Sequence, residues 1–205
     1  MTPIYHITHF SHLGSIIREG CLRCDREAQE LCSVRIGHAH IKSRRMKRPV
    51  PLPPGGTLGD YVPFYFAPRS PMLYAIDRGA VEGYAGGQAE VLHLVSSVEA
   101  VVEGGLSWLA TEGHAEMGYT AVFNNLADLD KIDWKLMTER YWHDTNDDPD
   151  RKRRRQAEFL VHRLFPWGMV QAIGVHNESM RELVVRETAD VPYRPEVRVE
   201  RGWYY

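Results

Sequence analysis

The sequence predicts a mixed α+β fold with many short strands. Segments in which apolar and polar residues alternate, as in a half-buried strand, recur along the chain between segments with apolar residues at helical spacing. The length of 205 residues, with 43% hydrophobic and 25% charged residues, is typical of a folded chain with a core of its own. Neither a repeat nor a linker divides it, so we expect one domain over residues 1–205.

The N-terminal unit is expected to be a strand, a turn and a helix. "PIYHIT" (3–8) alternates and predicts the strand. Ser11 is a candidate N-cap, apolar residues follow at helical spacing, and Gly20 stands where a helix-ending glycine belongs. Residues 36–62 follow, and their "PVPLPPGG" cannot form a regular helix or a central strand. This segment is therefore expected to be a long loop, which in a compact domain is usually functional.

The rest of the chain alternates short strands and helices. Residues 62–66 predict a strand in which Pro63 indicates an edge or a bulge, and 70–79 predict a helix with Ser70 at the N-cap and a proline at the first position. Further strands are expected at 91–95, 157–165, 170–177 and 196–205, a helix at 179–187, and helical structure near 123–141 with Leu126, Leu129, Trp134 and Tyr141 facing inward.

Composition narrows the cellular setting. The chain shows neither a signal peptide nor an apolar run approaching the roughly 20 residues that span a bilayer. Cys21, Cys24 and Cys32 are an odd number of cysteines, which we interpret as reduced thiols in a cytoplasmic protein. The net charge is −2, but "KSRRMKR" (42–48) and "RKRRR" (151–155) are concentrated basic runs. Either run could bind a polyanion, or the second could be a locally neutralised loop beside the acidic "DTNDDPD".

Metal binding is not expected. Cys21, Cys24 and Cys32 with His38 or His40 could in principle supply four zinc ligands, but a second paired motif is missing from the sequence. His6, His9 and His12 straddle a strand-to-helix turn, so a shared metal is not expected, and at least two of these histidines should be exposed polar groups. The P-loop, the dinucleotide-binding glycine motif and the standard hydrolase motifs are also missing.

Glu158 is the carboxylate that needs an explanation. It follows a basic run and begins an apolar strand, "AEFLVHRLF". It could be an outward-facing strand residue paired with Arg155. Alternatively, a carboxylate near a cationic wall can stabilise the oxocarbenium-like transition state formed when a bond at a sugar anomeric carbon breaks. That chemistry would suit NAD+, bound without a dinucleotide-binding fold between an aromatic wall and a cation.

Several of these segments together resemble one family. "PIYHIT", "IKSRR", "VPLPPGG", "DYVPFYFAPRSPMLYAI" and "QAEFLVHRLFPW" are similar to the DarT family of bacterial toxins, NAD-dependent enzymes that ADP-ribosylate bases in single-stranded DNA. The similarity extends nearly end to end, through the terminal "WYY", and is closer to the thymine-modifying branch than to the guanine-modifying one. It implies an ADP-ribosyltransferase-like fold with a central split β-sheet of mostly antiparallel strands and flanking helices.

The resemblance also implies roles for individual residues. Glu158 would be the catalytic glutamate and Arg45 the catalytic arginine, acting mainly in orientation and charge stabilisation because an arginine is a poor base. NAD+ would be held by His6, Ile7, Thr8, Ser15, Arg23 and Arg45, with residues 32–50 closing over it. His9 and His12 would be incidental.

Substrate recognition would involve a segment and a set of cations. The segment 113–158 would be the substrate loop, with His114 near the target base. One side of the 62–66 strand, carrying Tyr65, could stack on bases. Phosphate contacts could come from Lys42, Arg44, Lys47, Arg48 and Arg69.

The expected reaction is transfer of ADP-ribose to N3 of thymine in single-stranded DNA, sequence-selectively, which would block replication. The alternatives are another NAD-dependent transferase, either an RNA 2′-phosphotransferase or a protein ADP-ribosyltransferase, and a non-catalytic nucleic-acid-binding module. The resemblance further implies a macrodomain antitoxin that removes the modification. We expect a monomer that needs no metal and does not bind membranes.

Overall fold

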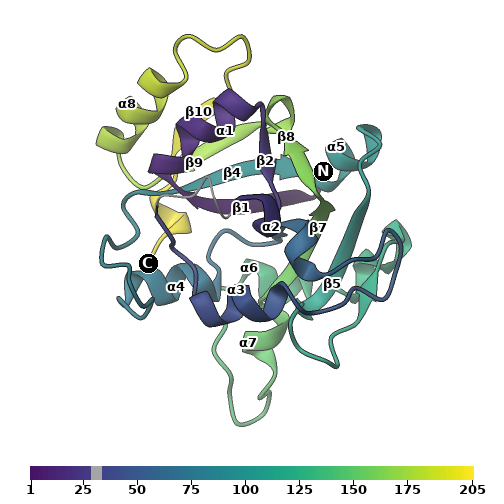
Figure 1. Cartoon of the computed structure of the whole chain (residues 1–205). Coiled ribbons are helices and arrows are strands. Elements are labelled where there is room, and N and C mark those ends of the chain that lie inside the picture. The colour runs from purple at the N-terminus through teal and green to yellow at the C-terminus, as the bar shows by residue number, and fades with distance from the viewer. Residues whose placement is uncertain (29–33) are drawn as a thin grey trace.

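The fold is built on a large β-sheet. The computed structural model describes residues 1–28 and 34–205, and within these ranges the sheet has eight strands in the order β10-β9-β4-β1-β3-β7-β5-β6 (Figure 1). β9 and β10 are parallel, and the other neighbouring pairs are antiparallel. The strands are β1 (Pro3–His9), β3 (Tyr61–Tyr65), β4 (Val91–Ser97), β5 (Trp108–His114), β6 (Val122–Phe123), β7 (Ala157–His162), β9 (Ala172–Val175) and β10 (Glu196–Val199). The predicted α+β sheet of mostly antiparallel strands is confirmed.

The sheet divides between β1 and β3. β1 pairs with β4 along its length, from Pro3 to His9, but meets β3 where Tyr5 lies opposite Tyr65. Beyond that point a side chain spans the gap, because Nδ1 of His6 donates a hydrogen bond to the carbonyl of Pro63 at 2.8 Å. A separate small sheet, formed by β2 (Cys21–Arg23) and β8 (Leu164–Pro166), lies in contact with β3. The split leaves side chains of both half-sheets free to line a site.

Pro63 lies in the interior of the sheet, so the predicted edge position is wrong. β3 pairs with β7 through the register Pro63 opposite Leu160. The nitrogen and carbonyl of one strand residue point to the same side, and the Pro63 carbonyl faces the split. The N–H that proline lacks would therefore have met no ladder partner there, which is why proline is tolerated in this central strand.

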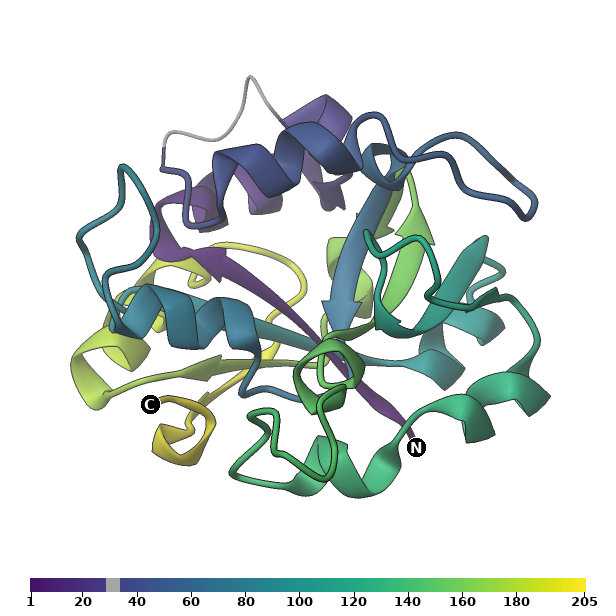
Figure 2. The same cartoon turned by 90° about the horizontal axis from the view of Figure 1, so that it is seen from below.

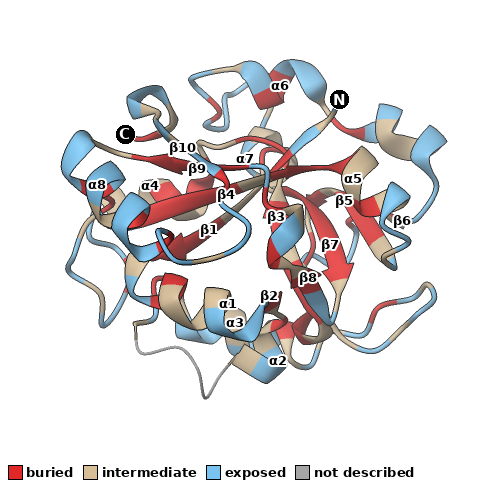
Figure 3. Cartoon of the chain, turned by 90° about the horizontal axis from the view of Figure 1, so that it is seen from above, coloured by how far each residue is buried: buried red, intermediate tan, exposed pale blue. Residues whose placement is uncertain are grey.

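Short helices cover both faces of the sheet. The α-helices are α1 (Leu13–Glu19), α2 (Asp25–Ala28), α3 (Ala39–Arg45), α4 (Pro71–Asp77), α5 (Val98–Glu103), α6 (Trp134–Thr138), α7 (Arg151–Arg154) and α8 (Glu178–Glu187). The 3₁₀ turns are η1 (Phe10–His12), η2 (Leu58–Asp60), η3 (Leu126–Lys131), η4 (Trp167–Met169) and η5 (Arg201–Trp203). α1, α2 and α3 gather on one side of the strands and α6 lies on the opposite side (Figures 2 and 3).

The core lies along the strands, which are mostly buried, while the helices expose their outer sides (Figure 3). On β3, Phe64 is 1% exposed and packs at 4.9 Å between ring centroids against Phe165. Tyr65 is the next residue and points to the other face, as strand alternation requires, where it is half-buried. The prediction that one side of this strand packs inward is confirmed.

Two expectations for the N-terminal half need correction. Residues 36–62 are not one loop, because 39–45 form helix α3; the proline- and glycine-rich part after it is irregular, as predicted. Ser11 is not an N-cap, because η1 comes first and the His9 side chain accepts from the Ser11 N–H in its place. Gly20, at φ 68, does end α1, and Ser70 caps α4 as predicted.

The second half departs from expectation at three places. Near 123–141 the chain forms η3 and α6, and Leu126, Trp134 and Tyr141 are exposed while Trp142 is buried. The segment 157–165 breaks at Arg163, whose positive φ of 65 turns the chain from β7 into β8. The C-terminal strand ends at Val199 and η5 follows. In each case a short local turn replaces a longer regular element.

Candidate active site

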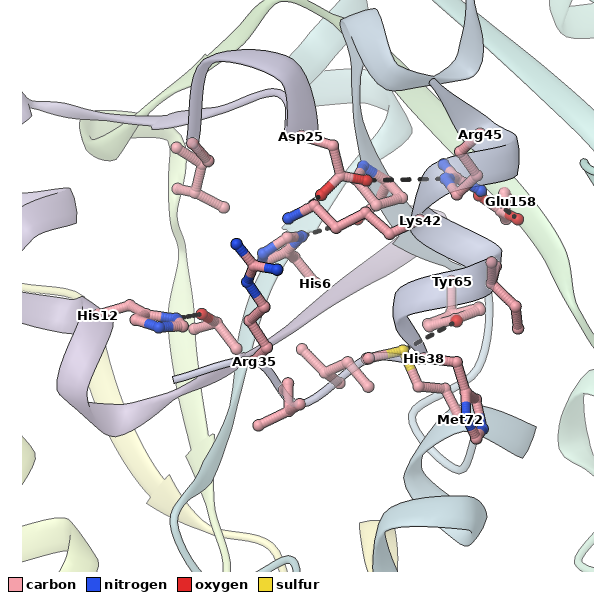
Figure 4. A pocket seen from close by; sticks show the side chains of 18 of the residues that line it. His6, His12, Asp25, Arg35, His38, Lys42, Arg45, Tyr65, Met72 and Glu158 are labelled. Carbon is pink, nitrogen blue, oxygen red and sulfur yellow. Dashed lines mark hydrogen bonds and ion pairs between the residues drawn. The ribbon is translucent and has the colours of Figure 1, made fainter. Parts of the chain in front are cut away.

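A cavity of about 490 Å³ opens where the sheet splits. Its walls come from β1, α1, β2, α2, α3, β3 and the start of β7. The predicted site residues that line it are His6, Ile7, Thr8, Ser15, Arg23, Lys42, Arg45, Tyr65, His114 and Glu158. Residues far apart in the chain thus converge on one site, as Figure 4 shows for the side chains that it labels.

A buried ion pair lies in this cavity. Nη1 of Arg45 donates to both carboxylate oxygens of Glu158, at 2.8 and 3.1 Å, and the two residues are 7% and 4% exposed. Glu158 lies opposite Tyr65 in the β3–β7 register, and its backbone N–H donates to Thr111. The alternative that Glu158 faces outward and pairs with Arg155 is therefore wrong. Arg155 is buried elsewhere, on the carbonyls of Arg69, Leu136 and Glu139.

Arg45 is charged and incompletely paired. Burial alone would lower its pKa, but the nearby carboxylates of Glu158 and Asp25 outweigh burial and hold the pKa above its ordinary value. Its Nη2 is buried and has no hydrogen-bond partner among the residues described. A buried donor without a partner costs roughly 1–3 kcal/mol. This donor is therefore suited to receive an acceptor from a ligand.

Asp25 is a site residue that sequence reasoning missed. Its carboxylate lies 3.1 Å from Nζ of Lys42 and 3.8 Å from Nε of Arg45 (Figure 4). It thereby links α2 to two cations on α3. Asp25 follows Cys24 within an ordinary mixed-charge stretch, so nothing in its local pattern distinguished it from a surface aspartate.

His6 forms one wall of the cavity. It is half-buried, and burial lowers its pKa even though its bond to Pro63 and the charge of Asp25 oppose that shift. Because Nδ1 donates to Pro63, Nε2 of the neutral ring is an acceptor.

His9 and His12 are buried, so the expectation of two exposed histidines is wrong. His9 donates through Nε2 to Glu90 at 2.9 Å. His12 accepts from the Val34 N–H at 3.3 Å through Nε2, and its Nδ1 donates to Thr8 at 3.1 Å. Burial lowers the pKa of His12 to about 4, with a smaller contribution from His9. His12 is therefore neutral, and it ties the segment that leads into α3 to β1.

Two of the predicted NAD+-binding residues are engaged locally. Ser15 donates to the His12 carbonyl at 2.7 Å. Arg23, at the edge of the cavity, forms ion pairs with Glu19 at 3.1 Å and Glu27 at 3.0 Å. To bind a ligand, Ser15 and Arg23 would each have to exchange these hydrogen bonds and ion pairs for contacts with the ligand, or share them with it.

The residues predicted to bind DNA do not all meet at the cavity. Lys42, Tyr65 and His114 line it, whereas Arg44, Lys47, Arg48 and Arg69 do not. Two guanidinium nitrogens of Arg44, Nε and Nη2, are paired with the Glu116 carboxylate. Arg69 stacks on the ring of Tyr205, 4.1 Å from its centroid. Their roles in binding remain predictions.

His114 and Tyr65 are uncharged groups in the cavity. Burial lowers the pKa of His114, although the nearby Glu158 acts in the opposite direction. Nδ1 of His114 accepts from the Glu116 N–H at 3.2 Å, so its proton resides on Nε2. Burial, and then the charge of Glu158, raise the pKa of the Tyr65 phenol.

The cysteines show no metal arrangement. Cys21 and Cys24 are buried free thiols whose pKa values are raised by burial, and Cys32 lies outside the described residues. Within residues 1–28 and 34–205, no three histidine, cysteine or acidic side chains are placed to share a metal ion. Among the same residues, no helix is both long and apolar enough to cross a membrane.

Comparison with known proteins places this geometry in a family. Residues 5–205 match the family model described as "ssDNA thymidine ADP-ribosyltransferase, DarT". A DNA ADP-ribosyl transferase of Thermus sp. (strain 2.9) is 44% identical over 206 residues, covering 100% of this chain and 96% of the relative.

Solved structures agree. The Thermus sp. 2.9 DarT in complex with ADP-ribosylated ssDNA superposes with a TM-score of 0.95 at 43% identity, covering 100% of this chain and 96% of that one. The same protein in complex with NAD+ gives a TM-score of 0.91 at 41% identity, covering 100% and 98%. The ADP-ribosyltransferase fold expected from the sequence is confirmed.

Proposed function

The chain belongs to the DarT family of NAD-dependent DNA ADP-ribosyltransferases, and from this premise we propose that it transfers ADP-ribose from NAD+ to N3 of thymine in single-stranded DNA. The observation that carries the proposal is the buried Arg45–Glu158 pair in a cavity at the split of the sheet. Two structures of a Thermus relative, one with NAD+ and one with ADP-ribosylated ssDNA, support it.

The cavity offers complementary groups to NAD+. Nε2 of His6 is free to accept a hydrogen bond from an amide such as that of nicotinamide. The unpartnered Nη2 of Arg45 and the ammonium of Lys42 are donors for an oxygen of the ribose or the diphosphate. Ile7 and Thr8 of β1 line the same wall.

Bond breaking would be assisted by Glu158. The bond between nicotinamide and C1′ of the ribose breaks, its electrons leave with neutral nicotinamide, and positive charge develops on the sugar. A buried carboxylate held by Arg45 and by the Ala115 N–H, at 3.4 Å, is preorganised to stabilise that charge. Arg45 would orient this carboxylate.

The thymine nitrogen would then attack C1′ and release its N3 proton to solvent. Arg45 is not suited to take that proton, since neighbouring carboxylates raise its pKa. His114 would orient the base, because its Nε2–H is a donor suited to a carbonyl of thymine. A paired base hides this ring edge, so an unpaired strand is the substrate reached at lowest cost.

The wider biology follows from the same proposal. Modification at N3 removes a hydrogen-bonding position needed for base pairing, so it would block replication. From the family resemblance we further infer that the enzyme acts sequence-selectively, as a toxin, in the cytoplasm and as a monomer. A macrodomain antitoxin that hydrolyses the modification would be its partner.

Mass spectrometry of short oligonucleotides tests the proposal. With NAD+ and enzyme, single-stranded oligomers containing thymine should gain the mass of one ADP-ribose and release nicotinamide, whereas thymine-free and duplex oligomers should not. Modification of guanine would overturn the base assignment. Transfer to protein, or consumption of NAD+ only with 2′-phosphorylated RNA, would identify one of the alternative transferases.

A further inference from the structure

The basic run on α7 leaves one side chain free. Arg151 pairs with Glu139, Arg153 with Glu112 and Asp150, and Arg154 with Asp133 and Asp148, while Arg155 is buried on backbone carbonyls. Lys152 is exposed, lines the cavity, and has no side-chain partner among the described residues. The run is therefore locally neutralised except at the residue that borders the site.

A second free cation lies beside the β5–β6 turn. The guanidinium of Arg48 approaches within 3.7 Å of the position that a Cβ atom would take on Gly118. Like Lys152, it has no side-chain partner within the part of the chain described. This turn is tightly closed, because Thr120 and Met117 both hydrogen-bond the His114 carbonyl, at 2.9 and 3.0 Å.

Tyr119 projects from this turn. It is 71% exposed, yet its ring is held in place, since the guanidinium of Arg153 lies 5.2 Å from its centroid. Arg153 is itself fixed by two hydrogen bonds to Glu112 at 2.7 and 2.8 Å. Met117, two residues before Tyr119, is 44% exposed and lines the cavity.

An exposed, positioned aromatic ring with unpaired cations nearby is an arrangement that binds single-stranded nucleic acid, the ring by stacking and the cations through phosphates. Arg48 lies against Gly118, the residue before Tyr119, and Lys152 precedes Arg153, whose guanidinium holds the Tyr119 ring. We propose that Tyr119, with Arg48 and Lys152 beside it, binds the nucleotide next to the modified one. This inference rests on the proposed function and deepens it by placing the flanking part of the strand on a defined rim.

The test uses the full chain and a thymine-containing oligonucleotide with 2-aminopurine beside the target. Stacking quenches this fluorophore, so wild type should quench it on binding. Tyr119→Ala should abolish the quenching and weaken binding on the order of tenfold, within the range measured for loss of one stacked base, while Tyr119→Phe should restore both. Tyr193→Ala, at an exposed tyrosine outside residues 113–158, is the control and should change neither.

The cations are tested by salt dependence. Arg48→Ala and Lys152→Ala should each reduce the slope of log affinity against log salt by about 0.7, the value for one phosphate contact on a single strand, whereas Arg186→Ala, at an exposed position on α8, should not. Unaltered quenching in Tyr119→Ala, or equal loss in Tyr193→Ala, would overturn the inference. If wild type modifies DNA in that case, the proposed function stands; if wild type modifies no DNA, the proposed function fails instead.

Discussion

At the residue scale, the Arg45–Glu158 pair explains how both side chains can be buried together. Removing one partner of a buried ion pair leaves the other uncompensated, which is strongly destabilising. The raised pKa of Arg45 excludes it as a proton acceptor. We therefore propose that both residues act by charge stabilisation.

This assignment predicts a separation of binding from turnover. Glu158→Gln keeps the shape and an acceptor for Arg45 but loses the charge, so kcat should fall on the order of a hundredfold to a thousandfold. NAD+ affinity measured by calorimetry should change little, because the charge acts mainly as the sugar becomes cationic. Glu178→Gln, which breaks an exposed ion pair with Arg181 on α8, should leave kcat unchanged. Near-normal turnover of Glu158→Gln would show that the carboxylate is structural.

His12 carries a second prediction at this scale. Its Nε2 accepts from Val34, so His12→Phe should release the segment that covers the cavity and leave the Val34 N–H unpaired. Loss of about 1 kcal/mol from one such hydrogen bond corresponds to NAD+ binding weakened about fivefold. His176→Phe, at a half-buried histidine that does not line the cavity, provides the comparison. If the NAD+ affinity measured by calorimetry is unchanged in His12→Phe, His12 has only a structural role.

At the element scale, α3 is the part that sequence reasoning least anticipated. The helix is seven residues long, carries four basic or polar side chains in "KSRR", and adjoins a run of prolines and glycines, so neither its apolar periodicity nor its end was visible. The strands bearing His6, Tyr65 and Glu158 were predictable because alternation, in the first two, and a continuous apolar run, in the third, are local signals. Asp25 was not predictable as a site residue, because its place in the site depends on Lys42 and Arg45, which only the tertiary fold brings near it.

The placement of α3 depends on Gly59 in η2. A Cβ atom there would lie 2.5 Å from Sδ and 3.1 Å from the backbone Cα of Met46, the residue that ends α3. Gly59→Ala should therefore displace the end of the helix and cost about 1–3 kcal/mol through overpacking. Thermal unfolding should shift down by several degrees and NAD+ affinity should fall, because Arg45 and Lys42 move with α3. Gly168→Ala, with no atom within 4 Å of its Cβ, should change neither quantity.

At the scale of the whole molecule, the division of the sheet creates the site. Eight strands could have formed a continuous surface, but the divergence of β1 from β3 leaves room for a cavity lined by both halves. The same arrangement buries histidines that would ordinarily be solvated. His12 lies at the cavity wall, and His93 of β4 is fully buried, donating through Nε2 to the Pro68 carbonyl at 3.0 Å.

Buried neutral histidines make the stability of the fold depend on pH. Burial lowers the pKa of His12 and of His93 to about 4 each, against roughly 6.5 in the unfolded chain. Between these values the unfolded chain binds more protons than the folded one, so stability is fully present above about pH 6.5 and falls as the pH is lowered.

Chemical unfolding should accordingly show a loss of about 2 kcal/mol per histidine between pH 6.5 and pH 5. His93→Gln removes one titrating group, so whatever its stability at neutral pH, its free energy of unfolding should decline less steeply over this interval than that of wild type. His40→Gln, at an exposed histidine, should keep the wild-type slope. If the His93→Gln and wild-type slopes are equal, proton binding on unfolding must occur at other groups, and the buried imidazole of β4 would not be a source of acid sensitivity.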